Sequence, residues 1–251
     1  FKGNGSVGQS EIIQSFPAVI LSDISSTNHT NNKFNEHSID AGLNYKRTFA
    51  KEDQELEVYM NSSTSRNNRD AANDQFLQPQ DSLIYGTNSN NPGKEKENEI
   101  GINYVQPLSK DVNLGVGGKL NAYDISSTSE AFVWQTSAKD YLYDSALSNS
   151  LDYRQKVYAA YSEISFPIGE LFQAKIGGRY ERTQINSSFS NAPDKVHNGY
   201  NTFVPSFFLM RKLGEKQTLK FNYSKRIERP DNGDLNPFIN TSDPKNVFTG
   251  N

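Results

Sequence analysis

The sequence has no cysteine and no long hydrophobic run, and these absences narrow the classes of protein to which it can belong. Without cysteine among its 251 residues, the chain can form neither a disulfide framework nor a thiolate metal site. No segment approaches the roughly 18 apolar residues that a membrane-spanning helix requires. The net charge is −3, and no basic stripe marks a surface for nucleic acid.

The motifs that carry catalytic chemistry are absent as well. The histidines, His29, His37 and His197, lack the spacing of a helical metal-binding pair. Neither a Gly-x-Ser-x-Gly nucleophile elbow nor a Gly-Lys-Ser/Thr phosphate loop occurs in the sequence. We therefore expect no catalytic, metal-binding or cofactor-binding residues, and an enzyme is the least favoured class.

What the sequence does contain is a repeated alternation of apolar and polar residues, which is typical of β-strands with two different faces. The expected strands are 12–26, 35–49, 54–67, 96–107, 111–126, 152–167, 171–188, 198–213 and 217–229. Several are much longer than the usual strand of about 5–6 residues. The pattern predicts an all-β fold in one domain over 1–251, an antiparallel up-and-down meander.

The connections between these segments differ in expected length. Four of them are tight, at Lys51–Asp53, Ser109–Lys110, Ile168–Glu170 and Gly214–Lys216. Others, around Thr27–Phe34, Arg69–Lys96 and Ser127–Leu151, are expected to be long polar loops, with a turn at Asn90-Asn91-Pro92-Gly93. Short turns alternating with long loops are typical of an outer-membrane β-barrel, with short periplasmic turns and long extracellular loops. The low mean hydropathy of −0.74 agrees with this, because only alternate residues of a barrel strand face lipid.

Segment 171–183 shows the alternation most clearly. Its apolar side chains are expected to face lipid, and these are Phe172, Ala174, Ile176 and Tyr180. Lys175, Arg179 and Glu181 fall on the opposite face, expected to line a wet lumen. A soluble sheet with one wet face remains the alternative, because alternation alone does not separate the two. The glycine pairs 117–118 and 177–178 are expected to relieve crowding or to let the sheet curve.

The 126–152 loop is the one candidate for ligand contact. It combines aromatic rings with carboxylates, which are Trp134, Tyr141, Tyr143, Asp140 and Asp144. Such a group suits a sugar, a planar chelate or a cation. The alternative, which we favour, is that these rings pack within the loop or on a neighbouring loop.

The last fifty residues carry a specific resemblance. The run Tyr223-Ser224-Lys225-Arg226-Ile227-Glu228-Arg229-Pro230 is followed by Leu235-Asn236-Pro237-Phe238, Asp243-Pro244 and Gly250-Asn251. Upstream lie Gly178-Arg179-Tyr180-Glu181-Arg182-Thr183 and the segment from Tyr200 to Ser206. In this order the motifs resemble those of TonB-dependent outer-membrane receptors, particularly the β-barrel type of the Bacteroidetes.

The resemblance implies what the whole protein would be. The chain is expected to be the middle-to-late part of a barrel of about 22 strands, partial because the plug, the TonB-contacting segment and the last strands are not in it. The absence of an initial methionine before Phe1 also points to a missing N-terminal region. The expected partners are outer-membrane lipid and a nutrient ligand, with TonB and the plug engaged through other parts of the protein, and no nucleic acid is expected.

The implied function is TonB-coupled uptake of a bulky nutrient: an iron chelate, an oligosaccharide or a peptide. The alternative is a passive porin, a surface adhesin or a soluble β-sheet binding module without a transport role. A plug and a TonB-contacting segment in the full-length protein would discriminate between them.

Overall fold

The computed structural model describes residues 6–14, 24–190, 195–214, 216–227, 240–243 and 246–248, with side chains described from residue 25 to 227 apart from 191–194 and 215. The strands are β1 Ser6–Gln14, β2 Ile24–Thr48, β3 Glu55–Leu77, β4 Ser82–Pro107, β5 Asn113–Gln135, β6 Asp140–Tyr143, β7 Asn149–Ile168, β8 Phe172–Phe189, β9 Val196–Lys212, β10 Thr218–Ser224, β11 Asn240–Asp243 and β12 Asn246–Phe248. Within the described residues, no helix is long and apolar enough to cross a membrane.

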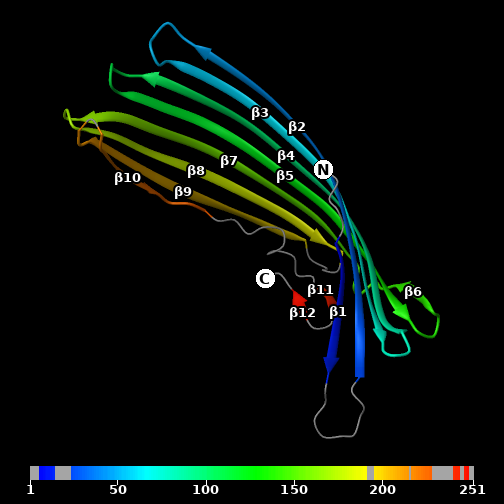
Figure 1. Cartoon of the computed structure of the whole chain (residues 1–251). Helices are drawn as coiled ribbons and strands as arrows, with labels where there is room; N and C mark the ends of the chain where they lie inside the picture. The colour runs from blue at the N-terminus through cyan, green and yellow to red at the C-terminus, as the bar shows by residue number, and fades with distance from the viewer. Residues whose placement is uncertain are drawn as a thin grey trace.

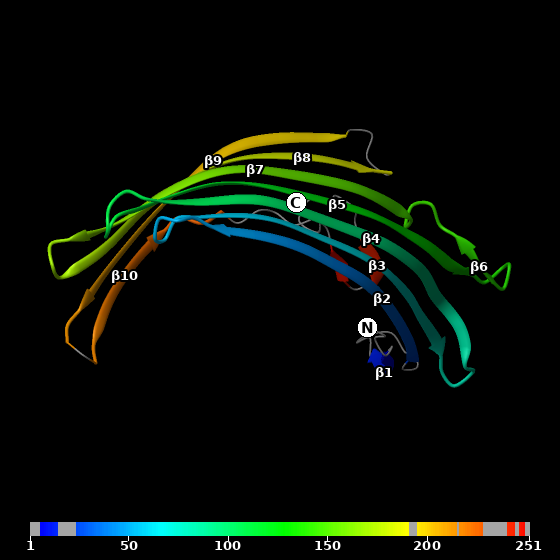
Figure 2. The same ribbon diagram turned by 90° about the horizontal axis from the view of Figure 1, so that it is seen from above.

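One large sheet contains nearly all of these strands. Its order is β1-β2-β3-β4-β5-β7-β8-β9-β10, with the short β6 pairing only with β5, while β11 and β12 form a separate pair. Every pairing is antiparallel between strands that follow one another along this path. The sheet curves like a section of a cylinder wall and does not close (Figure 2). The predicted all-β meander with nine principal strands is thus confirmed.

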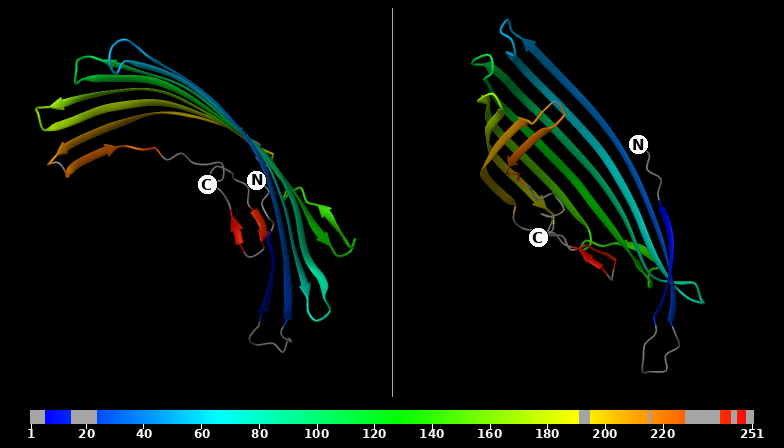
Figure 3. Two further views of the ribbon diagram at one scale, coloured as in Figure 1. Left: turned by 45° about the horizontal axis from the view of Figure 1, so that its top comes forward. Right: turned by 60° about the vertical axis from the view of Figure 1, so that its left-hand side comes forward.

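The connections between the strands are divided between the two ends of the sheet. The four tight connections, β2–β3, β4–β5, β7–β8 and β9–β10, lie together at one end (Figures 1 and 3). The β3–β4 and β5–β6 hairpins lie at the opposite end, and the β8–β9 connection belongs there too. Gly169 adopts a left-handed backbone with φ of 60° in the β7–β8 turn, where glycine has no steric penalty. The four predicted tight turns therefore share one end, but the predicted alternation of short turns with long loops does not hold, because the β3–β4 connection is also short.

Two of the predicted long loops are wrong, because they are strand instead. The 69–96 segment is divided between β3 and β4, which pair with each other as far as Leu77 opposite Ser82. The predicted turn at residues 90–93 lies inside β4, where Asn90 and Gly93 both pair with β5. Polar residues remain in strand here because the main-chain ladder, not apolar packing, holds the extended hairpin.

The first predicted strand is also wrong. Residues 12–26 do not form one strand, because Ile12 on β1 pairs with Ser26 on β2. The expected loop 27–34 is part of β2, which pairs continuously with β3 from Ser26 to Thr48. The connection between β1 and β2 and the motif residues 228–239 lie outside the described residues.

The third predicted loop is only partly a loop. The 126–152 segment continues β5 to Gln135, turns back as β6, and reaches β7 at Asn149. The resulting hairpin extends beyond the main sheet at the end opposite the tight turns (Figure 1). It therefore lies at the predicted end, although most of it is paired strand.

The two faces of the sheet differ in chemistry, as the alternation predicts. One face carries exposed large apolar side chains across eight strands: Leu43 and Tyr45 on β2, Val58 and Met60 on β3, Ile100 and Ile102 on β4, Val116 on β5, Tyr158 on β7, Ile176 and Tyr180 on β8, Phe203 on β9, and Leu219, Phe221 and Tyr223 on β10. We call this set the apolar belt. Lys175, Arg179 and Glu181 point to the opposite face, because they alternate with Ile176 and Tyr180 along β8. The Ala174 side chain shares the belt face but is 3% exposed and so is covered by its neighbours.

Two of the resemblance motifs lie side by side in the sheet. Gly178 pairs with Pro205, and Tyr180 pairs with Phe203 on the neighbouring strand. A Cβ at Gly178 would come within 2.9 Å of the Phe203 ring, so the glycine leaves room for that ring to lie across β8. Gly117 has the same role beneath the Tyr161 ring on the polar face. Both glycines relieve crowding, as predicted.

Candidate functional site

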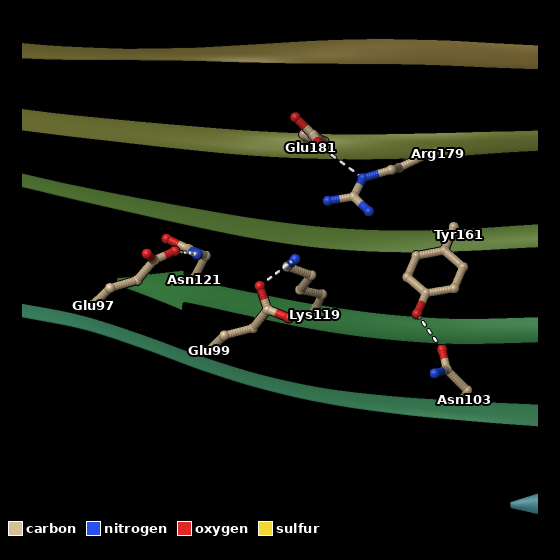
Figure 4. A network of polar contacts seen from close by, with 8 residues as sticks. All are labelled: Glu97, Glu99, Asn103, Lys119, Asn121, Tyr161, Arg179 and Glu181. Carbon is tan, nitrogen blue, oxygen red and sulfur yellow. Dashed lines mark hydrogen bonds and ion pairs between the residues drawn. The ribbon is translucent and has the colours of Figure 1, made fainter. Parts of the chain in front are cut away.

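The polar face is the concave face of the sheet, where side chains of neighbouring strands converge. Glu181, Thr183 and Ile185 are each at most 5% exposed there. Ionised and amide side chains from four successive strands, β4, β5, β7 and β8, meet on this face (Figure 4). We call this group the lumenal wall, and it consists of Glu95, Glu97, Glu99, Asn103, Lys119, Asn121, Tyr123, Tyr161, Arg179 and Glu181.

The β4–β5 part of the wall pairs acidic residues with donors. The Lys119 ammonium forms an ion pair with Glu99, its diagonal neighbour across the two strands. Asn121 Nδ2 donates to Glu97 Oε1 at 2.7 Å, and the Tyr123 hydroxyl donates to Glu95 at 3.2 Å. Three glutamates at alternate positions of β4 therefore each receive a donor from β5.

The centre of the wall is an aromatic and amide cluster. The Tyr161 hydroxyl donates to Asn103 Oδ1, and Asn103 Nδ2 donates to Glu57 at 3.0 Å. Asn44 donates to the other oxygen of Glu57 at 2.7 Å, which extends the network to β2. The Arg179 guanidinium lies 5.6 Å from the centre of the Tyr161 ring, within cation–π range.

The β8 part of the wall contains its most buried charge. Glu181 is 5% exposed, and Arg179 Nε donates to its Oε1 at 2.5 Å. Thr183, two residues further along the strand, is 1% exposed, and its hydroxyl has no partner among the described residues.

The lumenal wall is hollowed where its charges converge. An open hollow of about 440 Å³ is lined by Glu95, Glu97, Lys119, Asn121, Tyr123, Gln155, Val157 and Arg179. Its lining offers carboxylate acceptors and cationic donors in close succession, which suits a hydrophilic solute with several hydrogen-bonding groups. No group of three or more histidine, aspartate or glutamate side chains in the described part of the chain is placed to hold a metal ion.

The predicted ligand-contact residues gather on the β5–β6 hairpin. Trp134 pairs with Tyr141 across the hairpin, with ring centres 5.3 Å apart in an edge-on arrangement. Tyr143 packs in the same way on Phe132 at 5.8 Å and is 57% exposed. The hairpin thus has a packed aromatic pair at its tip and one accessible tyrosine at its base.

Several of these residues have structural partners within the protein. The Tyr141 hydroxyl donates to Asp74 of β3, and burial, followed by this hydrogen bond, raises the pKa of Tyr141 well above its usual value. Asp144 accepts the backbone N–H groups of Ala146 and Leu147, so it shapes the segment leading to β7. The Trp134 indole Nε1 is buried without a partner among the described side chains.

The hairpin is the part of the site that sequence reasoning found, and the lumenal wall is the part that it largely missed. The alternation did assign Lys175, Arg179 and Glu181 to a wet face. Only the strand register shows that Lys119 meets Glu99 and that Tyr161 meets Asn103. The signal that could have found the wall is the run from Lys94 to Glu99, in which lysine and glutamate alternate before Asn98 and thus fall on opposite faces.

Comparison with known proteins identifies a family and a solved structure with a similar architecture. Residues 47–251 match the family described as "Outer membrane protein beta-barrel family". Among solved structures, the crystal structure of the ferric citrate transporter FecA in the unliganded form is similar, with a TM-score of 0.53 and 13% identity. The alignment covers 87% of this chain and 35% of that transporter, so the chain spans about a third of its length. No curated protein sequence matches this chain.

Proposed function

The chain belongs to the outer membrane protein β-barrel family, and from this premise we propose that it forms part of the wall of a receptor that takes up a bulky nutrient with TonB-coupled energy. Membership of the family makes it an outer-membrane protein. In the proposed barrel the apolar belt faces lipid and the concave face lines the lumen. The proposed role is transport without enzymatic chemistry.

The observation that carries the proposal is the combination of a family match over most of the chain with a curved sheet that remains open after nine strands. A barrel with more strands than this has a wide lumen, of the kind that transporters fill with a plug. The motifs from Gly178 to Ser206 and after Tyr223 resemble TonB-dependent receptors and support the energy-coupled class.

The nutrient would be hydrophilic and bulky. The lumenal wall presents alternating carboxylates and cations, which can exchange hydrogen bonds with a passing solute. An iron chelate, an oligosaccharide and a peptide all meet this description. The likeness to a ferric citrate transporter is a likeness of fold, and it makes iron chelates the first class to test.

Uptake by intact cells tests the function directly. Cells with and without the gene for the full-length receptor would be given labelled iron chelates, oligosaccharides and peptides. We expect uptake of one class that depends on the receptor and that stops when the proton-motive force is dissipated or TonB is removed. Receptor-dependent uptake that continues without either would indicate a passive porin, and binding without uptake would indicate an adhesin.

The aromatic hairpin provides a test of ligand contact. Replacing Trp134, Tyr141 and Tyr143 together by alanine is expected to raise the dissociation constant of the nutrient about tenfold or more, because stacked rings contribute on the order of 1 kcal/mol each. Calorimetry on the detergent-purified receptor measures this. The Tyr141→Phe variant, which keeps the ring and loses the hydrogen bond to Asp74, is the matched control. An unchanged affinity in the triple variant would leave these rings a packing role only.

The orientation of the sheet can be measured by labelling. Cysteines placed singly at Gln80 and Ser137, in the β3–β4 and β5–β6 connections, are expected to react with a membrane-impermeant maleimide on intact cells. Cysteines at Glu52 and Glu170, in two of the tight turns, are expected to react only after permeabilisation. This part of the protein has no cysteine of its own, and the unsubstituted receptor gives the background. Labelling of the Glu52→Cys variant on intact cells would show that the tight turns face outward, opposite to the orientation proposed.

A further inference from the structure

The belt face changes character beyond the apolar belt, toward the end that carries the β5–β6 hairpin. Tyr158 and Tyr180, 43% and 52% exposed, are the last large apolar side chains that β7 and β8 place on the belt face in that direction. Aromatic side chains of this kind form the girdle where a barrel leaves the hydrocarbon. Beyond this girdle the same face carries Asp124 and Asp152 and, in larger number, exposed basic side chains from four strands: Arg66, Lys94, Lys96, Arg154, Lys156 and Arg182. We call these six residues the outer basic band.

The depth of the band follows from the strand geometry. Lys156 and Arg182 each stand two residues beyond Tyr158 and Tyr180, on the same face of the same strands. Tyr158 pairs directly with Arg182 across β7 and β8. Two residues of strand advance about 7 Å, so the cations begin one step beyond the girdle, at the level of lipid headgroups.

On β4 the two faces of this segment carry opposite charge. On β4, Lys94 and Lys96 point outward, while Glu95, Glu97 and Glu99 point to the lumenal wall. On β8, Arg182 points outward and Glu181 inward. β5 and β7 do not share this sorting, because Asp124 and Asp152 lie on the outer face among the more numerous cations.

The cations of the band also lack the partners that lumenal cations have. On the lumenal side, Lys46, Lys119, Lys175 and Arg179 each form an ion pair with a glutamate. In the band, Arg154 pairs with Asp124 at 2.7 Å. Among the described side chains, no carboxylate lies within ion-pair distance of the other five.

Two of these cations stand directly opposite each other. Arg66 on β3 pairs in register with Lys94 on β4, and both are exposed on the same face. Like charges directly opposite in a sheet are destabilising unless an anion lies between them. Lys94, Lys96 and Arg154 also line an open hollow of about 820 Å³ at this end of the sheet, together with Asp124 and Asp152, and its open side leaves room for an anion beside the lysines.

We propose that the outer basic band binds the phosphate groups of a phosphorylated glycolipid in the outer leaflet of the outer membrane. The acyl chains would lie on the apolar belt, and the phosphates would reach the cations just beyond the tyrosine girdle. Basic clusters at headgroup depth beside a membrane-spanning segment recognise anionic headgroups in this way. The inference requires that the protein is in the outer membrane and is independent of the nutrient-uptake role.

Binding of defined lipids to the full-length receptor in detergent tests the proposal. The probes are lipid A with both phosphates, lipid A with both removed, and inorganic phosphate alone. We expect the receptor to bind the phosphorylated form at least about tenfold more tightly than the dephosphorylated form, and the preference to weaken as salt is raised. Equal binding of the two lipids would overturn the proposal. If inorganic phosphate at the same phosphate concentration competed fully with the lipid, the ligand of the band would be a soluble anion and not a glycolipid.

A charge-neutralised variant assigns the preference to these residues. Replacing Lys94, Lys96 and Lys156 by glutamine is expected to abolish the preference for phosphorylated lipid A. The matched control carries the same charge change at the opposite end of the sheet, at Lys110, Lys212 and Lys216, and is expected to bind as the unsubstituted receptor does. The heat-modifiable mobility of both variants in gel electrophoresis verifies that the barrel is folded. A folded Lys94, Lys96 and Lys156 variant that keeps the full preference would exclude the band as the binding site.

Discussion

Replacing Met60 by arginine is expected to destabilise the folded barrel by about 2–4 kcal/mol, the cost of a cationic side chain on the lipid face near the bilayer midplane. Met60 lies in the apolar belt, paired in register with Leu43 on one side and Ile100 on the other. It is 46% exposed in the structure, so this surface meets lipid in the membrane. Urea titration of the receptor reconstituted in liposomes measures the change in the free energy of unfolding.

The adjacent residue provides the control. Asn61 follows Met60 on β3 but points to the concave face, where it pairs with Glu99. An Asn61→Arg substitution adds the same side chain beside a carboxylate and is expected to change stability by less than about 1 kcal/mol. Equal costs at positions 60 and 61 would contradict the assignment of the two faces.

Replacing Arg179 by methionine is expected to destabilise the barrel by about 2–3 kcal/mol. The substitution keeps much of the side-chain volume but removes the donor that lies 2.5 Å from Glu181. Glu181 is 5% exposed, and a buried carboxylate that loses a charged donor retains most of its desolvation cost. Thermal or urea unfolding of the purified receptor measures the loss.

A double-mutant cycle separates this pair from its surroundings. Glu181→Gln removes the charge at the other end, and the double variant Arg179→Met, Glu181→Gln carries neither charge. We expect the double variant to be more stable than Arg179→Met alone, with a coupling energy of about 1 kcal/mol or more between the two sites. Strict additivity of the two single variants would mean that the contact contributes nothing to stability.

The sequence predicts the strands well where lipid sorts the side chains. Within the apolar belt, the alternation through Val58, Met60, Ile100 and Ile102 reports directly on two different environments, lipid and water. The expected strands between residues 35 and 213 therefore coincide in order and direction with β2 to β9, apart from the short β6. The glycine pairs could be interpreted for the same reason, because a glycine in an alternating strand needs a neighbour that uses its space.

The prediction fails where the strands leave the lipid. There both faces meet water, so alternation disappears although the ladder continues. Asn90 to Gly93 then has the composition of a turn while remaining in β4. For the same reason, the lack of apolar–polar alternation, the sequence did not predict the hairpin in which Ile12 pairs with Ser26. Main-chain hydrogen bonds leave no signature in side-chain polarity, and the ends of such strands cannot be predicted from it.

The candidate site also has one part that the sequence predicts and one part that it does not. The aromatic hairpin could be predicted because tryptophan occurs once, in a polar segment. Its internal partners, such as Asp74 for Tyr141, could not, because they come from a strand 67 residues away in sequence. The lumenal wall likewise depends on register, which is set by pairing along the entire strand.

The strands extend far beyond the thickness of the membrane, and this has a consequence for how the protein can vary. β3 and β4 have 23 and 26 residues, whereas a bilayer is crossed by about 9–11 tilted residues. The remaining length is held together by main-chain pairing and by scattered polar contacts, so polar side chains outside those contacts can change at little cost to stability. Cell-surface proteins are exposed to antibodies and to phages that recognise their outward surface. A scaffold of this kind can change that surface residue by residue while the barrel beneath it keeps its shape.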